Sequence, residues 1–304
     1  MGVTIDDVTE IVAHRGSSAH VPEHTLAAYV QAIDEGADAL ECDVRLTADG
    51  HLVCVHDRRI DRTSDGRGVV SVMTLEDLSR HDFGQWRTAS LLSDLPGPRG
   101  DSDPLVIDES RRRVLTLERL LELVVDSERE IGMAIETKHP TRYAGLVEER
   151  TVELLKRFGL ARPRSERDSR IRVMSFSQLS MRRVRALAPG LPTVFLMDRV
   201  PVNFRNGALP FGSRIAGPSI DIVREHPRYV ERAHRAGAQV HVWTVDQPAD
   251  IDLCVELGVD AIITNRPGDV LTRLGRSVAT QPPTAAPAPE AARVTTLAGA
   301  RSRA

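Results

Sequence analysis

Eight short apolar segments, most of them followed by a stretch with helical spacing, constrain the fold of this chain more than any other feature. The segments lie near residues 13, 41, 134, 173, 195, 216, 242 and 262. Helical stretches at 24–35 and 142–158 follow the first and third of them. A strand that leads through a helix into a parallel strand is the βαβ unit. Eight such units predict an α/β fold, the (β/α)8 TIM barrel, and a doubly wound open sheet is the alternative.

Two parts of the chain fall outside this repeat. Residues 57–113 form a long insertion after the second strand, rich in turn-forming residues, and loops of this length tend to be lids or disordered. Residues 276–304 are rich in Pro and Ala without apolar periodicity, which is typical of a disordered tail. We therefore predict one barrel domain over residues 1–275 and a tail over residues 276–304.

The second strand, residues 39–46, runs into a predicted hairpin at Asp49-Gly50, because Asp-Gly supplies the positive φ of a tight turn. A two-residue turn would set Asp43 opposite His56, with Cβ atoms ~5 Å apart. Glu41 and Asp43 are two residues apart, so they share one face of the strand. Two carboxylates and an imidazole held together demand a cation or a raised pKa. The alternative is a solvated edge hairpin.

Further polar residues fall at the predicted carboxyl ends of neighbouring strands, where such barrels carry their active sites. His14 and Arg15 follow the first strand, and Glu136 and Lys138 end the third. Singly, each could be structural, for example Lys138 as an ion-pair partner of Glu136. Together they are hard to bury without a function, since unpaired buried charge costs several kcal/mol. Three carboxylates favour one hard divalent cation, Mg²⁺ or Ca²⁺, and the neighbouring Arg15 and Lys138 favour an anionic substrate such as a phosphate.

Composition excludes several other classes of protein. The formal net charge of −3 gives no indication of binding to nucleic acid or an anionic membrane. No apolar run reaches the roughly 18–20 residues of an integral membrane segment, and the N-terminal residues lack the pattern of a signal peptide. The three cysteines (Cys42, Cys54 and Cys254) lie in apolar patterns and fit a reducing cytoplasm. We expect a cytoplasmic protein with a small-molecule partner, and the sequence leaves its oligomeric state open.

Short motifs in a fixed order resemble those of the glycerophosphodiester phosphodiesterase family. The resemblance extends over residues 11–274 and is specific, because the order and spacing of the motifs hold over the whole predicted barrel. The first half carries His14-Arg15-Gly16, Pro22-Glu23-His24-Thr25, Glu41-Cys42-Asp43-Val44, Val55-His56-Asp57, Arg62-Thr63 and Ile135-Glu136-Thr137-Lys138. The second half carries Ser175-Phe176, Val242-Trp243-Thr244-Val245, Gly258-Val259-Asp260 and Ile263-Thr264-Asn265-Arg266-Pro267.

The resemblance implies a (β/α)8 barrel that hydrolyses a glycerophosphodiester to glycerol 3-phosphate and an alcohol with the help of a divalent metal. It assigns Glu41, Asp43 and Glu136 as metal ligands. It assigns His14 and His56 as the acid–base pair, without saying which is the acid and which the base.

The resemblance also implies the substrate contacts. Arg15 and Lys138 would hold phosphate oxygens, and Phe176 and Trp243 would line the glycerol or head-group side. One position departs from the family, which usually reads Pro-Glu-Asn-Thr, because His24 replaces the Asn. We expect this change to affect local geometry or a weak substrate contact and to leave the metal site untouched.

Two other functions would use the same residues. A lysophospholipase D-type phosphodiesterase acting on lysophospholipids would need an apolar groove, for which the insertion offers four candidates: Phe83, Trp86, Leu91 and Leu92. A non-catalytic phosphodiester-binding barrel would be expected to lack one of the catalytic residues, and none is missing.

Overall fold

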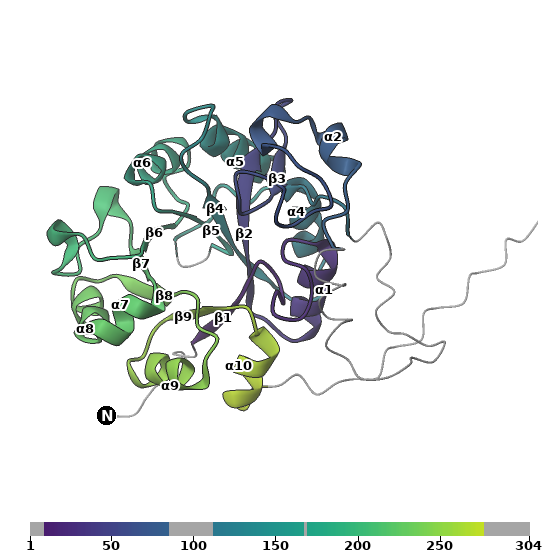
Figure 1. The fold of residues 1–304 in the computed structure, drawn as a ribbon. Coiled ribbons are helices and arrows are strands. Elements are labelled where there is room, and N and C mark those ends of the chain that lie inside the picture. The colour runs from purple at the N-terminus through teal and green to yellow at the C-terminus, as the bar shows by residue number, and fades with distance from the viewer. Residues whose placement is uncertain (1–8, 85–111, 167–168, 277–304) are drawn as a thin grey trace, which may run out of the picture.

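The computed structural model describes residues 9–84, 112–166 and 169–276. Eight parallel strands close into a barrel, because β1 pairs with both β2 and β9 and each remaining strand pairs with its neighbours (Figure 1). The strands are β1 (Glu10–His14), β2 (Ala39–Leu46), β4 (Gly132–Thr137), β5 (Ile171–Ser175), β6 (Thr193–Met197), β7 (Ile215–Pro218), β8 (Gln239–Val242) and β9 (Ala261–Thr264). The prediction of a (β/α)8 barrel is therefore confirmed, and the open sheet is excluded.

Helices surround the strands (Figure 1). They are α1 (Leu26–Asp34), α2 (Leu75–Ser79), α4 (Leu117–Val125), α5 (Leu146–Arg157), α6 (Gln178–Leu187), α7 (Ile220–Glu225), α8 (Arg228–Arg235), α9 (Pro248–Glu256) and α10 (Pro267–Arg273). Short 3₁₀ turns occupy Val70–Val72, Val202–Phe204 and Pro210–Gly212. Pro267 is the first residue of α10. Proline suits the first turn of a helix because its missing N–H would have no partner there.

Local sequence explains how α1 forms and where it packs. The Thr25 side chain caps it by accepting a hydrogen bond from the Ala28 N–H. Ala28, Tyr29 and Ala32 are buried and recur at helical spacing, so one face of α1 packs against the strands. After α1 the chain enters β2, which runs parallel to β1 in a register that pairs His14 with Glu41.

The hairpin after β2 forms as predicted, but its register is not the predicted one. β3 (Leu52–Cys54) runs antiparallel to β2, and Val44 pairs with Cys54. Asp43 therefore lies opposite Val55, whose N–H donates to the Asp43 carbonyl at 3.0 Å, and not opposite His56. The cause is a turn of three residues, 48–50, closed by a hydrogen bond from the Thr47 N–H to the His51 carbonyl at 2.9 Å.

Part of the insertion after β3 packs as a small apolar cluster of its own. Phe83 is buried there with Val53, Val55, Ile60, Val70 and Leu78. The prediction that Phe83 helps to line an apolar groove is therefore wrong. The other three candidates for that groove, Trp86, Leu91 and Leu92, lie outside the described residues, as does the predicted tail beyond Arg276.

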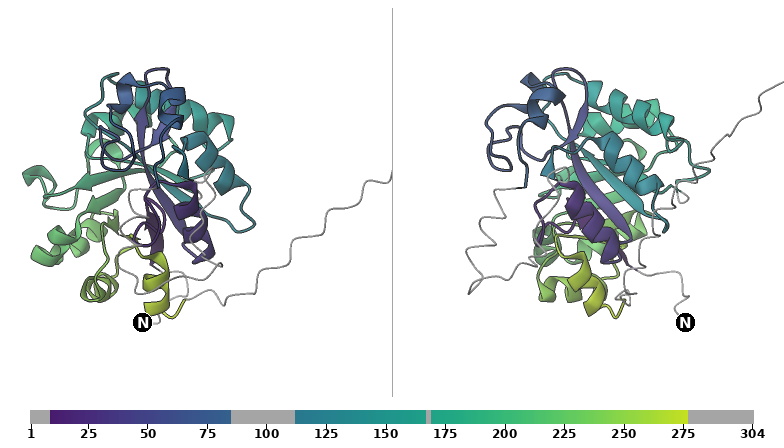
Figure 2. Two further views of the ribbon diagram at one scale, coloured as in Figure 1. Left: turned by 45° about the vertical axis from the view of Figure 1, so that its right-hand side comes forward. Right: turned by 90° about the vertical axis from the view of Figure 1, so that its right-hand side faces the viewer.

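The hairpin and α2 lie together at one end of the molecule, and α10 lies at the opposite end, in both views of Figure 2. Within the barrel, a layer of apolar side chains that includes Val12, Ala134 and Val194 fills the interior. Among the described residues, no helix is both long enough and apolar enough to cross a membrane.

Candidate active site

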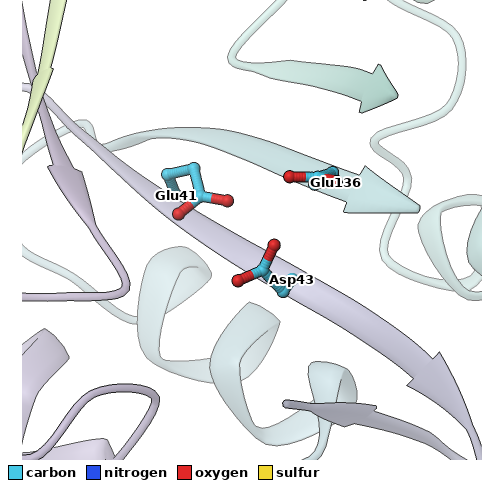
Figure 3. Close-up of side chains that lie close together, drawn as sticks. All are labelled: Glu41, Asp43 and Glu136. Carbon is cyan, nitrogen blue, oxygen red and sulfur yellow. The ribbon is translucent and has the colours of Figure 1, made fainter. Parts of the chain in front are cut away.

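Three buried carboxylates converge at the centre of the predicted site (Figure 3). Asp43 of β2 and Glu136 of β4 are direct partners in the parallel ladder, and Glu41 precedes Asp43 by two residues on the same face. One carboxylate oxygen from each of the three lies within 4.8 Å of the others. The strand register therefore brings together groups that are far apart in sequence.

Burial of these three acids perturbs their ionisation. Burial and the charge of Asp43 raise the pKa of Glu41 well above its usual range. The same two causes raise the pKa of Glu136 to about 8. Burial also acts to raise the pKa of Asp43, but the hydrogen bond from His24 and the charges of Arg15 and Lys138 hold it well below its usual range. Additional positive charge among the carboxylates would allow all three to ionise.

Two cationic side chains already lie against the acids. Lys138 Nζ is 2.9 Å from Glu136 Oε1 and 3.2 Å from Asp43 Oδ1. Arg15 Nε is 3.1 Å from Asp43 Oδ2, and its Nη1 donates to Glu23 at 3.0 Å. Both cations keep part of their surface exposed, so they border the acids on the solvent side.

The donor set fits a hard divalent cation. All three candidate ligands are carboxylates, which are the groups that Mg²⁺ and Ca²⁺ prefer. Asp43 Oδ1 is buried and accepts no hydrogen bond of good geometry, although Lys138 lies beside it. A buried carboxylate oxygen of this kind has an open position for a ligand on the inner side of the cluster.

The hydrogen bonds of His14 define which of its nitrogens can accept a proton. Asn265 Nδ2 donates to Asp246, so Asn265 Oδ1 faces His14 Nδ1 at 2.8 Å. A carbonyl oxygen only accepts, so the Nδ1 position carries the proton and Nε2 keeps a lone pair. That Nε2 lies 4.0 Å from Glu41 Oε2. Burial and the nearby Arg15 lower the pKa of His14 to about 3, which keeps the ring neutral at neutral pH.

His56 follows β3 and is held by an acid of its own. His56 Nδ1 lies 2.7 Å from Asp57 Oδ1, while Asp57 Oδ2 accepts from Arg62 Nε at 2.6 Å. Burial lowers the pKa of His56, and Asp43 and the hydrogen bond to Asp57 oppose that shift. With Nδ1 donating to Asp57, Nε2 has no hydrogen-bond partner among the residues that the structure describes.

Two aromatic side chains stand on the rim of the same barrel end. Phe176 follows β5 and Trp243 follows β8, and their ring centroids are 5.4 Å apart in an edge-to-face contact. Trp243 Nε1 donates to the Gly217 carbonyl at 2.7 Å, which fixes its orientation. Phe176 is 42% exposed, so one apolar face is open to a ligand.

The expectation for His24 is wrong, because this residue contacts one of the candidate metal ligands. It was expected to leave the metal site untouched, yet His24 Nε2 lies 2.9 Å from Asp43 Oδ2. Its Nδ1 lies 2.8 Å from the Tyr29 hydroxyl, which donates to the Glu41 carbonyl at 3.0 Å. His24 therefore holds the carboxylate of Asp43, and Tyr29 holds the backbone at Glu41.

Three other supporting residues were not predicted. Asn265 and Asp246 orient His14, and Glu23 joins Arg15 to Arg62. Glu23 and Asn265 stand inside the recognisable motifs, which is the signal that could have identified them. Asp246 lies just after the Trp243 motif and carries no comparable signal.

A closed (β/α)8 barrel with buried carboxylates, two oriented imidazoles and two cations at the carboxyl ends of its strands defines a barrel enzyme with a site suited to an anionic substrate.

Comparison with known proteins narrows this class. The model of the glycerophosphoryl diester phosphodiesterase family matches residues 14–269. "Probable glycerophosphodiester phosphodiesterase 1" of Mycobacterium tuberculosis is 48% identical over 258 residues, which is 85% of this chain and 89% of that protein. A glycerophosphodiester phosphodiesterase of Caldanaerobacter subterraneus is 32% identical and is aligned over 85% of this chain and 95% of its own length. The chain belongs to the glycerophosphoryl diester phosphodiesterase family and is a phosphoric diester hydrolase.

Solved structures agree on the fold. An Oleispira antarctica phosphodiesterase, crystallised with the product sn-glycerol-3-phosphate, superposes with a TM-score of 0.73 at 22% identity, covering 88% of this chain and 97% of that one. The crystal structure of a putative glycerophosphoryl diester phosphodiesterase from Silicibacter pomeroyi gives a TM-score of 0.71 at 24% identity, covering 90% and 96%.

Proposed function

We propose that the protein hydrolyses glycerophosphodiesters to glycerol 3-phosphate and an alcohol, with one divalent cation, Mg²⁺ or Ca²⁺, held by Glu41, Asp43 and Glu136. The observation that carries the proposal is the meeting of these three carboxylates beside two imidazoles that each keep one nitrogen free. The names of the relatives and the product bound in the Oleispira structure support the same substrate class.

When bound, the cation would polarise the phosphoryl oxygens and favour ionisation of a nucleophile, either water or the glycerol hydroxyl of the substrate. Arg15 and Lys138 hold the phosphate oxygens and stabilise the negative charge that develops on them. Phe176 and Trp243 pack against the carbon skeleton of the substrate. The rim aromatics thus position the diester, and the two cations orient its phosphate over the acids.

His14 acts as the general base in this proposal. Its Nε2 lone pair faces the acids, and Asn265 holds the tautomer that leaves Nε2 unprotonated. His56 acts as the general acid, because the negative charge of Asp57 stabilises the protonated ring that must donate to the leaving alkoxide. Each such proton transfer accelerates a reaction by roughly 10²–10⁴-fold.

The histidine roles are tested with His14→Ala and His56→Ala, assayed on glycerophosphocholine. We expect kcat to fall by about 10²–10⁴-fold in each variant while the melting temperature changes little. His51→Ala, at the exposed hairpin turn, is the matched control and should keep full activity. A wild-type rate in either catalytic variant would remove that histidine from the scheme.

The cytoplasmic location is also kept as a proposal. It rests on the three thiols of Cys42, Cys54 and Cys254, all of which are buried and free.

A further inference from the structure

A cavity of about 470 Å³ is lined in part by Lys138, one of the two cations that contact the acidic cluster. It lies between the carboxyl end of β2, the segment 58–72 and the segment 138–147 that leads into α5. Two of these walls are tied together, because the Tyr143 hydroxyl donates to the Ser71 carbonyl at 2.8 Å. The cavity is therefore a built feature of three chain segments.

The charge of the cavity wall is one-sided. Arg45, Arg58, Lys138 and Arg142 line it, and within the part of the chain that the structure describes no acidic side chain does. No carboxylate oxygen of the described ranges lies within 4.0 Å of a guanidinium nitrogen of Arg45, Arg58 or Arg142. Many other arginines are paired, as Arg62 is with Glu23 and Asp57. The remaining lining is largely aliphatic, so the positive charge of Arg58 and Arg142 favours an anion in this cavity.

Two residues connect this cavity to the reaction centre. Lys138 lines the cavity and also contacts Glu136 and Asp43. Arg45 follows Asp43 by two residues on β2, and its guanidinium donates to the His56 carbonyl at 2.9 and 2.7 Å. One wall of the cavity is therefore bonded to the backbone of His56, the proposed acid. Trp243 follows β8, which lies across the barrel from β4.

The position of the cavity identifies which part of a substrate would enter it. If His56 protonates the leaving alkoxide, the alcohol of the diester departs on the His56 side. The glycerol phosphate half then lies toward Trp243, across the barrel from β4. Whatever group the leaving alcohol carries thus faces Arg45, Arg58 and Arg142.

We propose that this cavity binds an anionic group on the leaving alcohol, so that the preferred substrates are glycerophosphodiesters whose alcohol carries a phosphate or a carboxylate. The inference rests on the proposed function and names the substrate class of that site. Guanidinium groups suit both anions, because their donors match pairs of phosphate or carboxylate oxygens.

Two matched pairs of substrates test the proposal and separate the two anions. Glycerophosphoglycerol and its derivative phosphorylated on the leaving glycerol differ only by a phosphate. Glycerophosphoethanolamine and glycerophosphoserine differ only by a carboxylate. For the wild-type enzyme with Mg²⁺ or Ca²⁺, we expect kcat/KM to be at least about tenfold higher for the anionic member of at least one pair.

Substitutions on the cavity wall provide a second test of the proposal. Arg58→Gln and Arg142→Gln remove exposed guanidinium groups that make no contact with the acids. Each should lower kcat/KM for the preferred substrate by about tenfold and leave kcat/KM unchanged for its partner, which lacks the added phosphate or carboxylate. Arg228→Gln on α8, also exposed, is the matched control and should change neither.

The outcomes distinguish this proposal from the function on which it rests. Equal kcat/KM values within both pairs, or equal losses on all substrates in the two cavity variants, would overturn the anionic subsite while the phosphodiesterase activity stands. Hydrolysis of none of the four diesters would overturn the proposed function, and the subsite with it.

Discussion

The imidazole of His24, which stands where the family usually has Asn, contacts a carboxylate at the centre of the site. It is buried, and its two nitrogens contact Asp43 and Tyr29. Groups that hydrogen-bond to a metal-ligating side chain fix its orientation, and their loss typically costs 10–100-fold in metal affinity. We infer that His24 is a positioning residue for Asp43.

Replacing His24 by Ala is expected to weaken binding of Mg²⁺ or Ca²⁺ by about 10–100-fold, measured by isothermal titration calorimetry. The reason is that Asp43 loses the hydrogen bond that fixes its carboxylate. His24→Asn should recover part of the affinity, since an amide can still donate. His20→Ala, an exposed histidine of the same loop, is the control. Unchanged affinity in His24→Ala would show that Asp43 is positioned without it.

At the scale of elements, a chain of ion pairs joins the loop between β1 and α1 to the segment that follows β3. Glu23 accepts from Arg15 at 3.0 Å and from Arg62 at 2.7 and 2.8 Å, and Arg62 continues to Asp57 and so to His56. His14 ends β1 directly before the first of these segments, and His56 lies in the second, so the ion pairs link the proposed base to the proposed acid.

The charge of Glu23 should therefore stabilise the fold in a pH-dependent way. Burial favours the protonated acid, but the hydrogen bond from Arg62 and the charge of Arg15 lower the pKa of Glu23 to about 2. A folded-state pKa below the ordinary value contributes stability above about pH 4.5, which is lost as the pH falls toward 2. The contribution at pH 7 is of order 2–3 kcal/mol.

Glu23→Gln is accordingly expected to lower the free energy of unfolding by about 2–3 kcal/mol at pH 7, measured by urea titration. The difference from wild type should shrink between pH 4.5 and the acid limit of folding. The exposed pair of Glu76 and Arg80 provides the control, since Glu76→Gln should cost at most about 1 kcal/mol. Equal stability of Glu23→Gln and wild type at pH 7 would contradict this account.

At the scale of the whole molecule, the three carboxylates join two neighbouring strands of a closed barrel, so a bound cation should stabilise the entire fold. Adding Mg²⁺ or Ca²⁺ at about 100 times its dissociation constant should raise the melting temperature by roughly 5–10 °C. The shift should vanish in Glu136→Gln, and chelator should abolish hydrolysis until the cation is restored. Full activity in excess chelator, or equal melting with and without cation, would defeat the metal assignment.

The eight strands could be predicted because each is a short apolar run bounded by turn signals, and the pairs Glu41/Asp43 and Glu136/Lys138 follow from the two-residue period of a strand. The hairpin register could not be read in the same way. Asp49-Gly50 is compatible with turns of two or three residues, and hydrogen bonding of Thr47 to His51 selects the longer one.

The chemical groups of this protein, and the order of strands and helices that carries them, can be predicted from the amino-acid sequence, because both depend on residue type and local periodicity. Which of these groups meet depends on the folded chain. Barrel closure brings Asn265 to His14 across 251 positions, and the loop between β1 and α1 places His24 beside Asp43. Three separate segments bring together the arginines of the cavity. Such contacts depend on strand register and on the entropy-limited closure of long loops, and neither is encoded in any short stretch of chain.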